Sequence, residues 1–390
     1  MDIMRGTPPP PEARVTLDNW DSPPFNRWAF CHVSEVLPTV RVHRGTGPRS
    51  SLPIGLKPIE DIRFRDSDGA EIAITDWLEQ NFTDGFLVMH RGQIVFERYF
   101  NGMPAHALHL SQSVAKSFVC AVGGALSGQG AVEVDAPLES FIPELADCGY
   151  AGASLRHVMD MQTGVDFIED YLDPDSHVAI IDRVGGWKPR RTDDPDTMLD
   201  LVLRLKQTRP HGEYWEYRSI ETDIAAMCLE RATGERLADL VSRLIWDPLG
   251  AEEDANFTVD RAGYAMGCGG FNATLRDYAR FGQMLTEGGS FNGNQVLPEA
   301  FVSESRQGDP TKFRDYPALP NGAYRNGFWI EDVDTGVLMC RGIFGQLIYS
   351  DPANDLTAVH LATWPEPQSE RRGAELRAAI HAIKDWLRTA

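Results

Sequence analysis

The chain has 390 residues and a net charge of −20, and 42% of its residues are hydrophobic and 24% charged. This composition is typical of a globular protein, long enough for two domains or for one core with an inserted lobe. The negative charge argues against nucleic acids and anionic membrane surfaces as partners, because both would repel the chain.

Neither a membrane span nor a leader segment is indicated by the sequence. No stretch is long and apolar enough to cross a bilayer, and the proline-rich start has no apolar core of the kind found in signal peptides. A cytoplasmic location is therefore predicted. The six cysteines are scattered, without a C-x-x-C pair or metal-ligand spacing, so we expect no disulfide, no bound metal and no cofactor.

The first 85 or so residues precede a strong hairpin signal. Residues 1–55 are rich in proline, arginine and turn formers, and are expected to form a partly irregular arm with an aromatic cluster. That cluster comprises Trp20, Phe25, Trp28 and Phe30. Two strand-like runs follow, at 86–90 and 93–100, and the Arg91-Gly92 pair between them predicts a two-residue hairpin turn.

The next segment, 110–126, begins with polar residues and then becomes almost wholly apolar. A helix that is apolar on every side is a buried helix. Ser113 and Lys116 would lie in its first turn, on one face, because they are three positions apart. Burial favours the neutral form of a lysine, so the pair is suited to a Ser-Lys acyl-transfer site. S-x-x-K also occurs by chance, so the assignment depends on the downstream residues.

Helices dominate the middle of the chain, and strands return near its end. Four helices are predicted there, and a further helix at 274–286. Their ranges are 154–161, 197–207, 219–233 with Gly234 as its stop, and 236–246. Residues 167–191 are predicted to be a long functional loop. Strands are expected at 327–332, 337–350 and 356–364, before an amphipathic helix at 369–388.

Two downstream segments could complete a Ser-Lys site. Tyr217 and Ser219 precede a predicted helix, and a phenol near a lysine can exchange protons with a serine or a leaving group. The alternative is a core tyrosine with a satisfied hydroxyl. The strand-like run from Cys340 to Tyr349 contains glycines, which mark either a ligand's approach to the backbone or a bulge. A backbone N–H there, with that of Ser113, could form an oxyanion hole.

These three motifs, Ser113-x-x-Lys116, Tyr217-x-Ser219 and the glycine-containing strand, occur in an order that resembles the serine β-lactamase and penicillin-recognising fold. The Tyr-x-Ser motif resembles that of its class C and carboxylesterase branch. More narrowly, the chain resembles the 6-aminohexanoate-dimer hydrolase family over nearly its whole length. The shared motifs are Pro23–Phe30, Ser113–Ser117, Glu169–Pro174, Tyr217–Ser219 and Gly342–Gln346.

The resemblance implies specific roles. Ser113 would be the nucleophile, Lys116 its basic partner and Tyr217 the proton shuttle. The backbone N–H groups of Ser113 and Ile343 would form the oxyanion hole. Substrate contacts are implied at Tyr171, Asp182, Ser219, Cys268 and Gly345, with Asp182 receiving a substrate ammonium. The alternative for Asp182 is a surface pair with Arg183 or Arg190.

Two departures from related enzymes affect the expected substrates. Cys340-Arg341-Gly342 lacks the lysine of true β-lactamases, which argues against binding a penicillin carboxylate. Cys268 stands where nylon-oligomer hydrolases carry a polar side chain, and this difference argues against efficient hydrolysis of a linear amide. Other motifs, including the G-x-S-x-G elbow, H-E-x-x-H and the P-loop, are absent from the sequence.

The sequence therefore predicts an α/β (α+β) protein of the β-lactamase/transpeptidase type, with an antiparallel sheet flanked by helices. Residues 1–130 and 265–390 would form a discontinuous α/β domain, and 131–264 a mainly helical lobe. The predicted function is a serine hydrolase that forms an acyl-enzyme with amides or esters of short linear acids. The alternatives are a carboxylesterase with little amidase activity and a catalytically silent ligand-binding member. The expected partner is a small-molecule substrate, and a homodimer is left open.

Overall fold

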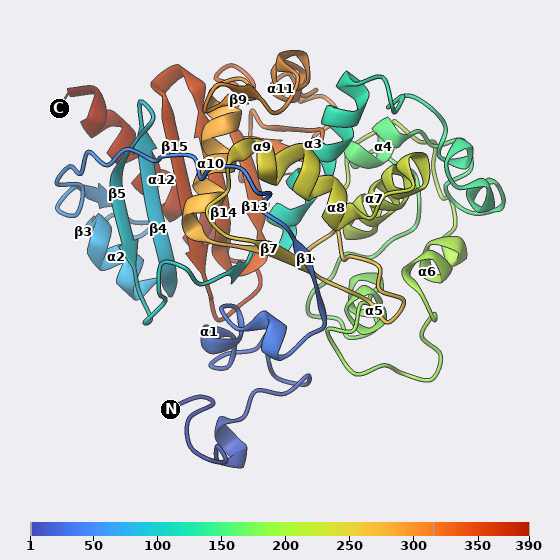
Figure 1. Ribbon diagram of the computed structural model, residues 1–390, viewed down its shortest axis with the longest axis horizontal. Coiled ribbons are helices and arrows are strands. Elements are labelled where there is room, and N and C mark those ends of the chain that lie inside the picture. Colours follow the sequence, from blue (N-terminus) through green and yellow to red (C-terminus); the bar gives the residue numbers. More distant parts are fainter. Residues whose placement is uncertain (1, 315, 390) are drawn as a thin grey trace.

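An antiparallel sheet of seven strands joins the two ends of the chain in the computed structural model, which describes residues 2–314 and 316–389 (Figure 1). Its strand order is β11-β12-β13-β14-β15-β4-β5. The strands are β4 (Thr83–His90), β5 (Gln93–Tyr99), β11 (Ala323–Arg325), β12 (Phe328–Ile330), β13 (Leu338–Gly342), β14 (Gln346–Asp351) and β15 (Leu356–Ala362). The prediction of one sheet that both chain ends complete is confirmed.

Each face of this sheet is covered by a helix that the sequence predicts. Along β4, Phe86 and Val88 belong to the core cluster of α12 (Glu370–Thr389), whereas Leu87 and Met89 belong to that of α10 (Leu275–Thr286). Successive side chains of a strand point to opposite faces, so one apolar strand serves two cores. Figure 1 shows α10 and α12 on either side of the sheet.

The predicted hairpin is confirmed. Strands β4 and β5 pair with His90 opposite Gln93. Arg91 and Gly92 both have positive φ angles, of 52° and 72°. A two-residue turn with φ positive at both positions matches the twist of the strands that it joins.

The helix behind Ser113 is buried, as its sequence indicates. It forms α3 (Ala115–Gly128), in which every side chain from Ala115 to Leu126 is buried. Ser113 itself lies in the preceding 3-10 turn, Gln112–Val114, so the helix begins two residues after it. Helix α3 packs against α7 (Ser219–Thr233), whose bounds and Gly234 stop are those predicted.

A second sheet, not predicted from the sequence, links the N-terminal arm to the rest of the chain. Its order is β1-β7-β8-β6, with β1 (Thr39–Val42), β6 (His109–Leu110), β7 (Ala255–Thr258) and β8 (Phe271–Ala273). The arm is more regular than expected, since it also contains α1 (Asn26–Ala29) and two 3-10 turns. Trp20 and Phe30 are fully buried beside Trp187 and Phe344, which anchors the arm.

Several predicted boundaries in the middle of the chain need correction. Residues 167–191 are not one loop, because α5 (His177–Val184) lies within them, capped where Ser176 Oγ accepts from Ala179 N at 3.2 Å. Helix α6 (Met198–Arg204) ends before 207. The 236–246 helix becomes α8 (Leu237–Val241) followed by a π-turn at Ser242–Trp246. Helix α4 (Leu155–Met159) has the expected cap at Ser154. The proposed domain boundaries stay a prediction.

The C-terminal strands also differ in one respect. The run 337–350 is two strands, β13 and β14, interrupted by a 3-10 turn at Ile343–Gly345. The remaining elements are α2 (Ile74–Gln80), α9 (Asp247–Leu249), α11 (Glu299–Ser305), β2 (Arg63–Arg65), β3 (Glu71–Ala73), β9 (Ser290–Phe291) and β10 (Asn294–Gln295), with 3-10 turns at Pro11–Ala13, Val33–Glu35, Leu138–Ser140, Pro143–Asp147 and Pro352–Asn354. Among the described residues, no helix combines the length and hydropathy required to cross a membrane.

Candidate active site

Ser113 and Lys116 are in direct contact at the start of α3. The Lys116 Nζ donates to Ser113 Oγ at 2.9 Å and to the backbone carbonyl of Cys268 at 2.5 Å. Lys116 is 1% exposed, whereas Ser113 is half-buried and lines a cavity. The lysine is therefore held by two acceptors inside the protein, and the serine hydroxyl faces the cavity.

Tyr217 completes this cluster from the N-terminal side of α7. Its ring centroid lies 5.2 Å from Lys116 Nζ, and it lines the same cavity as Ser113. The structure thus brings Tyr217 to the Ser113–Lys116 pair, which lies about a hundred positions earlier in the sequence. Tyr217 also packs against the hydrophobic core, so the alternative of a core tyrosine with a satisfied hydroxyl stays open beside the role of a proton shuttle.

Burial and neighbouring acidic groups shift the pKa of Lys116 in opposite directions. Burial lowers its pKa, but the negative charges that Tyr217, Cys268 and Glu169 can carry raise it, and the net direction is upward. Burial also raises the pKa of Tyr217, against the lowering effect of the Lys116 charge. Desolvation alone does not make the lysine neutral, because acidic groups surround it. The upward direction of both pKa shifts favours the protonated form of each residue.

This protonation predicts the pH dependence of turnover. Lys116 and Tyr217 can accept the serine proton only after one of them has lost its own proton. Because the two groups interact, that loss has an apparent pKa that belongs to the pair rather than to either residue. Because the pKa values of Lys116 and Tyr217 are both shifted upward from ordinary values near 10, we expect kcat/KM for an uncharged ester to rise continuously from about pH 6 to about pH 9, without a plateau. Steady-state rates in a constant-ionic-strength buffer series test this, and a profile that is flat or falls over that range would contradict it.

The end of β13 approaches the backbone next to Ser113. A Cβ on Gly342 would lie 2.4 Å from the carbonyl oxygen of Ser111, so this approach requires glycine. Ile343, Gly345 and Ser113 line one cavity. Gln112 and Phe344, which flank this contact, have φ angles of 51° and 61°. Left-handed backbone at non-glycine residues is strained and is concentrated at functional sites.

Glu169 is a site residue that the sequence analysis missed as an individual group, although its motif was recognised. Its carboxylate accepts from Ser219 N at 2.8 Å, from Ser219 Oγ at 2.6 Å and from Tyr171 OH at 2.6 Å. It therefore caps the N-terminus of α7, where negative charge is favoured, and holds Tyr171 at the cavity wall. Its partners lie 2 and 50 positions away, and no local pattern links it to Ser219.

Asp182 lies on α5 rather than in a loop, and it is not among the residues that line the cavity. The predicted surface alternatives are not seen, because Arg183 Nε binds Asp194 at 3.0 Å and Arg190 binds Asp196 at 3.2 Å. Burial and then the negative charge of Asp21 raise the pKa of Asp182 to about 8. A half-buried carboxyl with a raised pKa would gain from a cationic neighbour.

Cys268 contacts Lys116 through its backbone carbonyl rather than through its side chain. Its carbonyl accepts from Lys116, and its N–H donates to Asp223 Oδ1 at 3.1 Å. Asp223 is buried on α7, and Tyr264 OH donates to its carbonyl at 2.8 Å. Asp223, which the sequence analysis did not single out, therefore positions the segment that holds Lys116.

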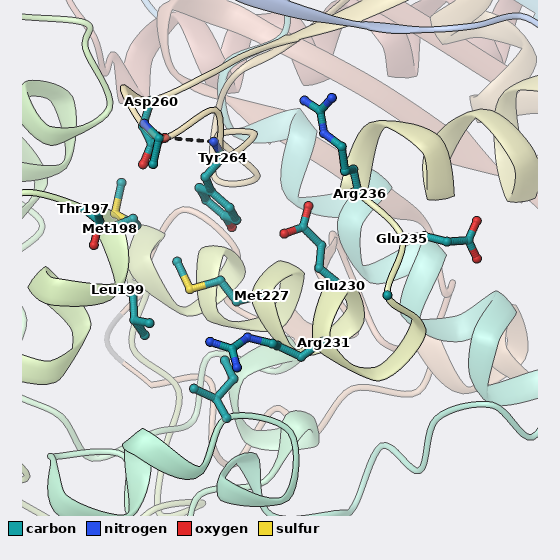
Figure 2. Close-up of a pocket in the computed structure, with 13 residues that line it drawn as sticks. Thr197, Met198, Leu199, Met227, Glu230, Arg231, Glu235, Arg236, Asp260 and Tyr264 are labelled. Carbon is teal, nitrogen blue, oxygen red and sulfur yellow. Dashed lines mark hydrogen bonds between the residues drawn. The ribbon is translucent and has the colours of Figure 1, made fainter.

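Two cavities stand out. The one that contains Ser113 has a volume of about 950 Å³ and is lined by Tyr171, Tyr217, Ile343 and Gly345 among others. The second, of about 430 Å³, lies beside α7 and α6, where Met198, Met227 and Tyr264 form its wall (Figure 2). Of the predicted site residues, the first cavity receives all but Lys116, Asp182, Ser219 and Cys268. Three of these four lie next to the cavity: Lys116 contacts Ser113, Ser219 contacts Glu169, and Cys268 contacts Lys116.

Across residues 2–314 and 316–389, no three His, Cys, Asp or Glu side chains converge as a set that could hold a metal ion. The arrangement described here consists of a serine, a lysine and a tyrosine beside the close backbone approach at Gly342.

Comparisons with known proteins agree with this geometry. The β-lactamase family matches residues 78–382. A 6-aminohexanoate-dimer hydrolase from Paenarthrobacter ureafaciens is 35% identical over 358 residues, which cover 91% of this chain and 89% of that protein. The esterase EstB from Burkholderia gladioli is 30% identical over 149 residues, which cover 36% of each chain.

A solved structure supports the same grouping. A Bacillus anthracis protein assigned as a 6-aminohexanoate-dimer hydrolase superposes with a TM-score of 0.90 at 29% identity, covering 98% of this chain and 99% of that one. Similarity of this extent covers the sheet, the helical segment and the arm together. The chain therefore belongs to the β-lactamase family of serine hydrolases, among the relatives of the 6-aminohexanoate-dimer hydrolases.

Proposed function

We propose that this protein hydrolyses amides or esters of short linear acids, 6-aminohexanoyl amides among them, through an acyl-enzyme on Ser113. The observation that carries the proposal is the 2.9 Å hydrogen bond from Lys116 Nζ to Ser113 Oγ at the wall of a cavity of about 950 Å³. A serine in contact with a proton-accepting partner, and open to a substrate, is the basic requirement for nucleophilic catalysis.

The reaction would proceed in two steps. Ser113 Oγ attacks the carbonyl carbon, its proton passes to the Lys116–Tyr217 pair, and the oxyanion is held by the N–H groups of Ser113 and Ile343. Tyr217 then delivers a proton to the leaving amine or alcohol as its bond to the carbonyl breaks. In the second step water attacks the acyl carbon and gives a proton to the same pair, which returns it to Ser113 Oγ as the bond from Oγ to the acyl carbon breaks and the acid is released.

The substrate class is supported by the relative's name and by the walls of the cavity. The Paenarthrobacter relative is named for hydrolysis of the 6-aminohexanoate dimer. Acidic groups line the cavity on the segment 166–216, where an ammonium at the end of a short chain would be favoured. Members of this group are Asp166, Glu169 and Asp170; Glu216 also lines the cavity, but its carboxylate pairs with Arg209 and Arg218.

One panel tests the proposal. Wild-type protein and Ser113→Ala are assayed on the 6-aminohexanoate dimer, on p-nitrophenyl esters of increasing acyl length and on nitrocefin. We expect the wild type alone to turn over the dimer and the short esters, and to leave nitrocefin intact. Turnover of esters without any turnover of the dimer would favour the carboxylesterase alternative, and no turnover at all would favour a silent ligand-binding protein.

Replacing Asp182 by glycine tests whether this carboxylate binds the substrate ammonium. A charge-assisted contact contributes about 1.5–3 kcal/mol. We therefore expect Asp182→Gly to reduce kcat/KM for the 6-aminohexanoate dimer by about ten- to a hundredfold, and to leave p-nitrophenyl acetate nearly unchanged.

The matched control is Asp196→Gly, which removes a carboxylate that pairs with Arg190 at the surface. It should affect neither substrate. An equal loss on both substrates in Asp182→Gly would mean that Asp182 supports α5 only, and no loss on either would remove it from the site.

A further inference from the structure

The second cavity, of about 430 Å³, is separate from the catalytic one. Among the residues that the structure describes, the two cavities have no lining residue in common. The second lies between α6, the C-terminal half of α7 and the turn at 260–264. Its volume is in the range of small-molecule sites, which combine mostly apolar walls with a few polar groups. The proposed hydrolysis does not use this cavity.

Apolar side chains form much of its wall. Met198 is fully buried, and Ile142 and Met227 are almost so. The ring of Tyr264 adds an aromatic surface, which is held in place because its hydroxyl donates to the Asp223 carbonyl at 2.8 Å. Methionine side chains adapt to ligands of different shape. This wall therefore suits a short hydrocarbon chain.

Two carboxylates at this cavity have no cationic partner. No Lys, Arg or His nitrogen in residues 2–314 and 316–389 lies within 4 Å of Glu230 or Asp260. Glu230 is half-buried, and its Oε1 accepts from Leu237 N at 2.6 Å. Asp260 is 5% exposed, and its Oδ1 accepts from Ala262 N and Tyr264 N, both at 2.8 Å. Burial raises the pKa of both carboxyls, so a cation beside them would stabilise their charged forms.

Other charged groups that line the cavity are paired with residues outside it. Glu235 lies 2.6 Å from Arg243, and Arg231 lies 3.3 Å from Glu144. Figure 2 shows the carboxylates of Glu230 and Glu235 directed to different sides. Glu235 therefore contributes little charge to the cavity, and it differs in this respect from Glu230.

Arg236 is the remaining charged residue of the lining. It is exposed, and within residues 2–314 and 316–389 no carboxylate lies within 4 Å of its guanidinium. Its positive charge lowers the pKa of Glu230, although the larger effect of burial raises it. Two carboxylates against one guanidinium leave the wall with a negative balance, which favours a cationic ligand.

We propose that this cavity is a second binding site, which takes a small primary ammonium ion on a short apolar chain. Glu230 and Asp260 hold the ammonium, and Met198 and Met227 contact the chain. The site binds without reacting, because its hydroxyls are engaged: Tyr264 OH donates to Asp223, and Thr197 Oγ1 donates to Asp200 at 2.7 Å. The proposal does not depend on the proposed hydrolysis.

Methionine methyl groups can report on each cavity separately. Met198 and Met227 line the second cavity, whereas Met339 lines the catalytic one. Isotope-labelled methionine methyl resonances, assigned by Met→Leu substitutions, are followed by NMR during titration with hexylamine and with hexanol near neutral pH. Hexylamine is protonated there, as a lysine is. We expect saturable shifts at Met198 and Met227, with hexanol binding at least about tenfold more weakly.

Three variants separate charge recognition from general damage. Glu230→Gln keeps an acceptor for Leu237 N but removes the charge, and should weaken hexylamine by about tenfold or more. Glu235→Gln is the matched control, and should leave the affinity within about twofold of wild type. Arg236→Gln removes a charge of the same sign as the ligand's, so it should tighten binding rather than weaken it.

The outcomes are distinct. Equal affinity for hexylamine and hexanol, or equal weakening by Glu230→Gln and Glu235→Gln, would overturn the ammonium site. Shifts confined to Met339 would also overturn it, because they would place the amine in the catalytic cavity. The comparison of hexylamine with hexanol needs no variant, so it decides the proposal even if a substitution impairs folding, which thermal unfolding would show. Failure of every hydrolysis assay would overturn the proposed function and leave this result unchanged.

Discussion

Ser113→Ala should hydrolyse no ester above the background rate and should take up no fluorophosphonate. Removing the nucleophile of a covalent hydrolase lowers kcat by about 10⁴- to 10⁶-fold, because the remaining groups cannot form the acyl-enzyme. In this protein the substitution removes one of the two acceptors of Lys116 Nζ and leaves the Cys268 carbonyl in place. The change in unfolding free energy should therefore stay within about 1 kcal/mol.

The labelled residue can be located by mass spectrometry. In the wild type, the adduct should lie on the tryptic peptide 99–116, which contains Ser113. Ser117→Ala is the matched control: this serine is on the same helix, but its hydroxyl is buried and donates to the Gly327 carbonyl at 2.8 Å. It should label like the wild type. Full labelling of Ser113→Ala would mean that another residue is the nucleophile.

Lys116→Ala should lose about three orders of magnitude or more in kcat/KM for a short ester at neutral pH. Ser113 Oγ would then lose the amine that contacts it at 2.9 Å, the basic member of the proposed Lys116–Tyr217 pair. Part of any loss could come from folding, because the Cys268 carbonyl would lose its charged donor, at a cost of about 1–3 kcal/mol. Thermal unfolding measured alongside activity separates these two effects.

Lys116→Arg distinguishes a base from a fixed charge. An arginine keeps the positive charge but cannot give up its proton in a protein. If Lys116 is the proton acceptor, Lys116→Arg should be nearly as inactive as Lys116→Ala, whatever the pH. Activity within about tenfold of wild type in either variant would assign Lys116 a structural role instead.

Local patterns in the sequence were enough for the elements that carry the proposed chemistry. Ser113 and Lys116 are three residues apart, and that spacing by itself places them on one side of a helical turn. The β4–β5 hairpin and the bounds of α7 follow from Arg91-Gly92 and from Gly234, because turn and stop residues act on their neighbours. The family motifs then associated Tyr217 and Ile343 with that pair.

The contacts between distant segments were decided only by the tertiary structure. Glu169 bonds to Ser219, Asp223 to Cys268, and β1 pairs with β7 over two hundred residues away, and no periodicity marks such partners. The effect of burial on the pKa of Lys116 could be predicted from the apolar helix, but the opposing effect of Tyr217, Cys268 and Glu169 could not, because these groups come from other elements. The stacking of Arg341 on Trp329 likewise depends on how β12 and β13 lie together. Pair interactions of this kind are determined by packing, and a single sequence records only the local preferences of each partner.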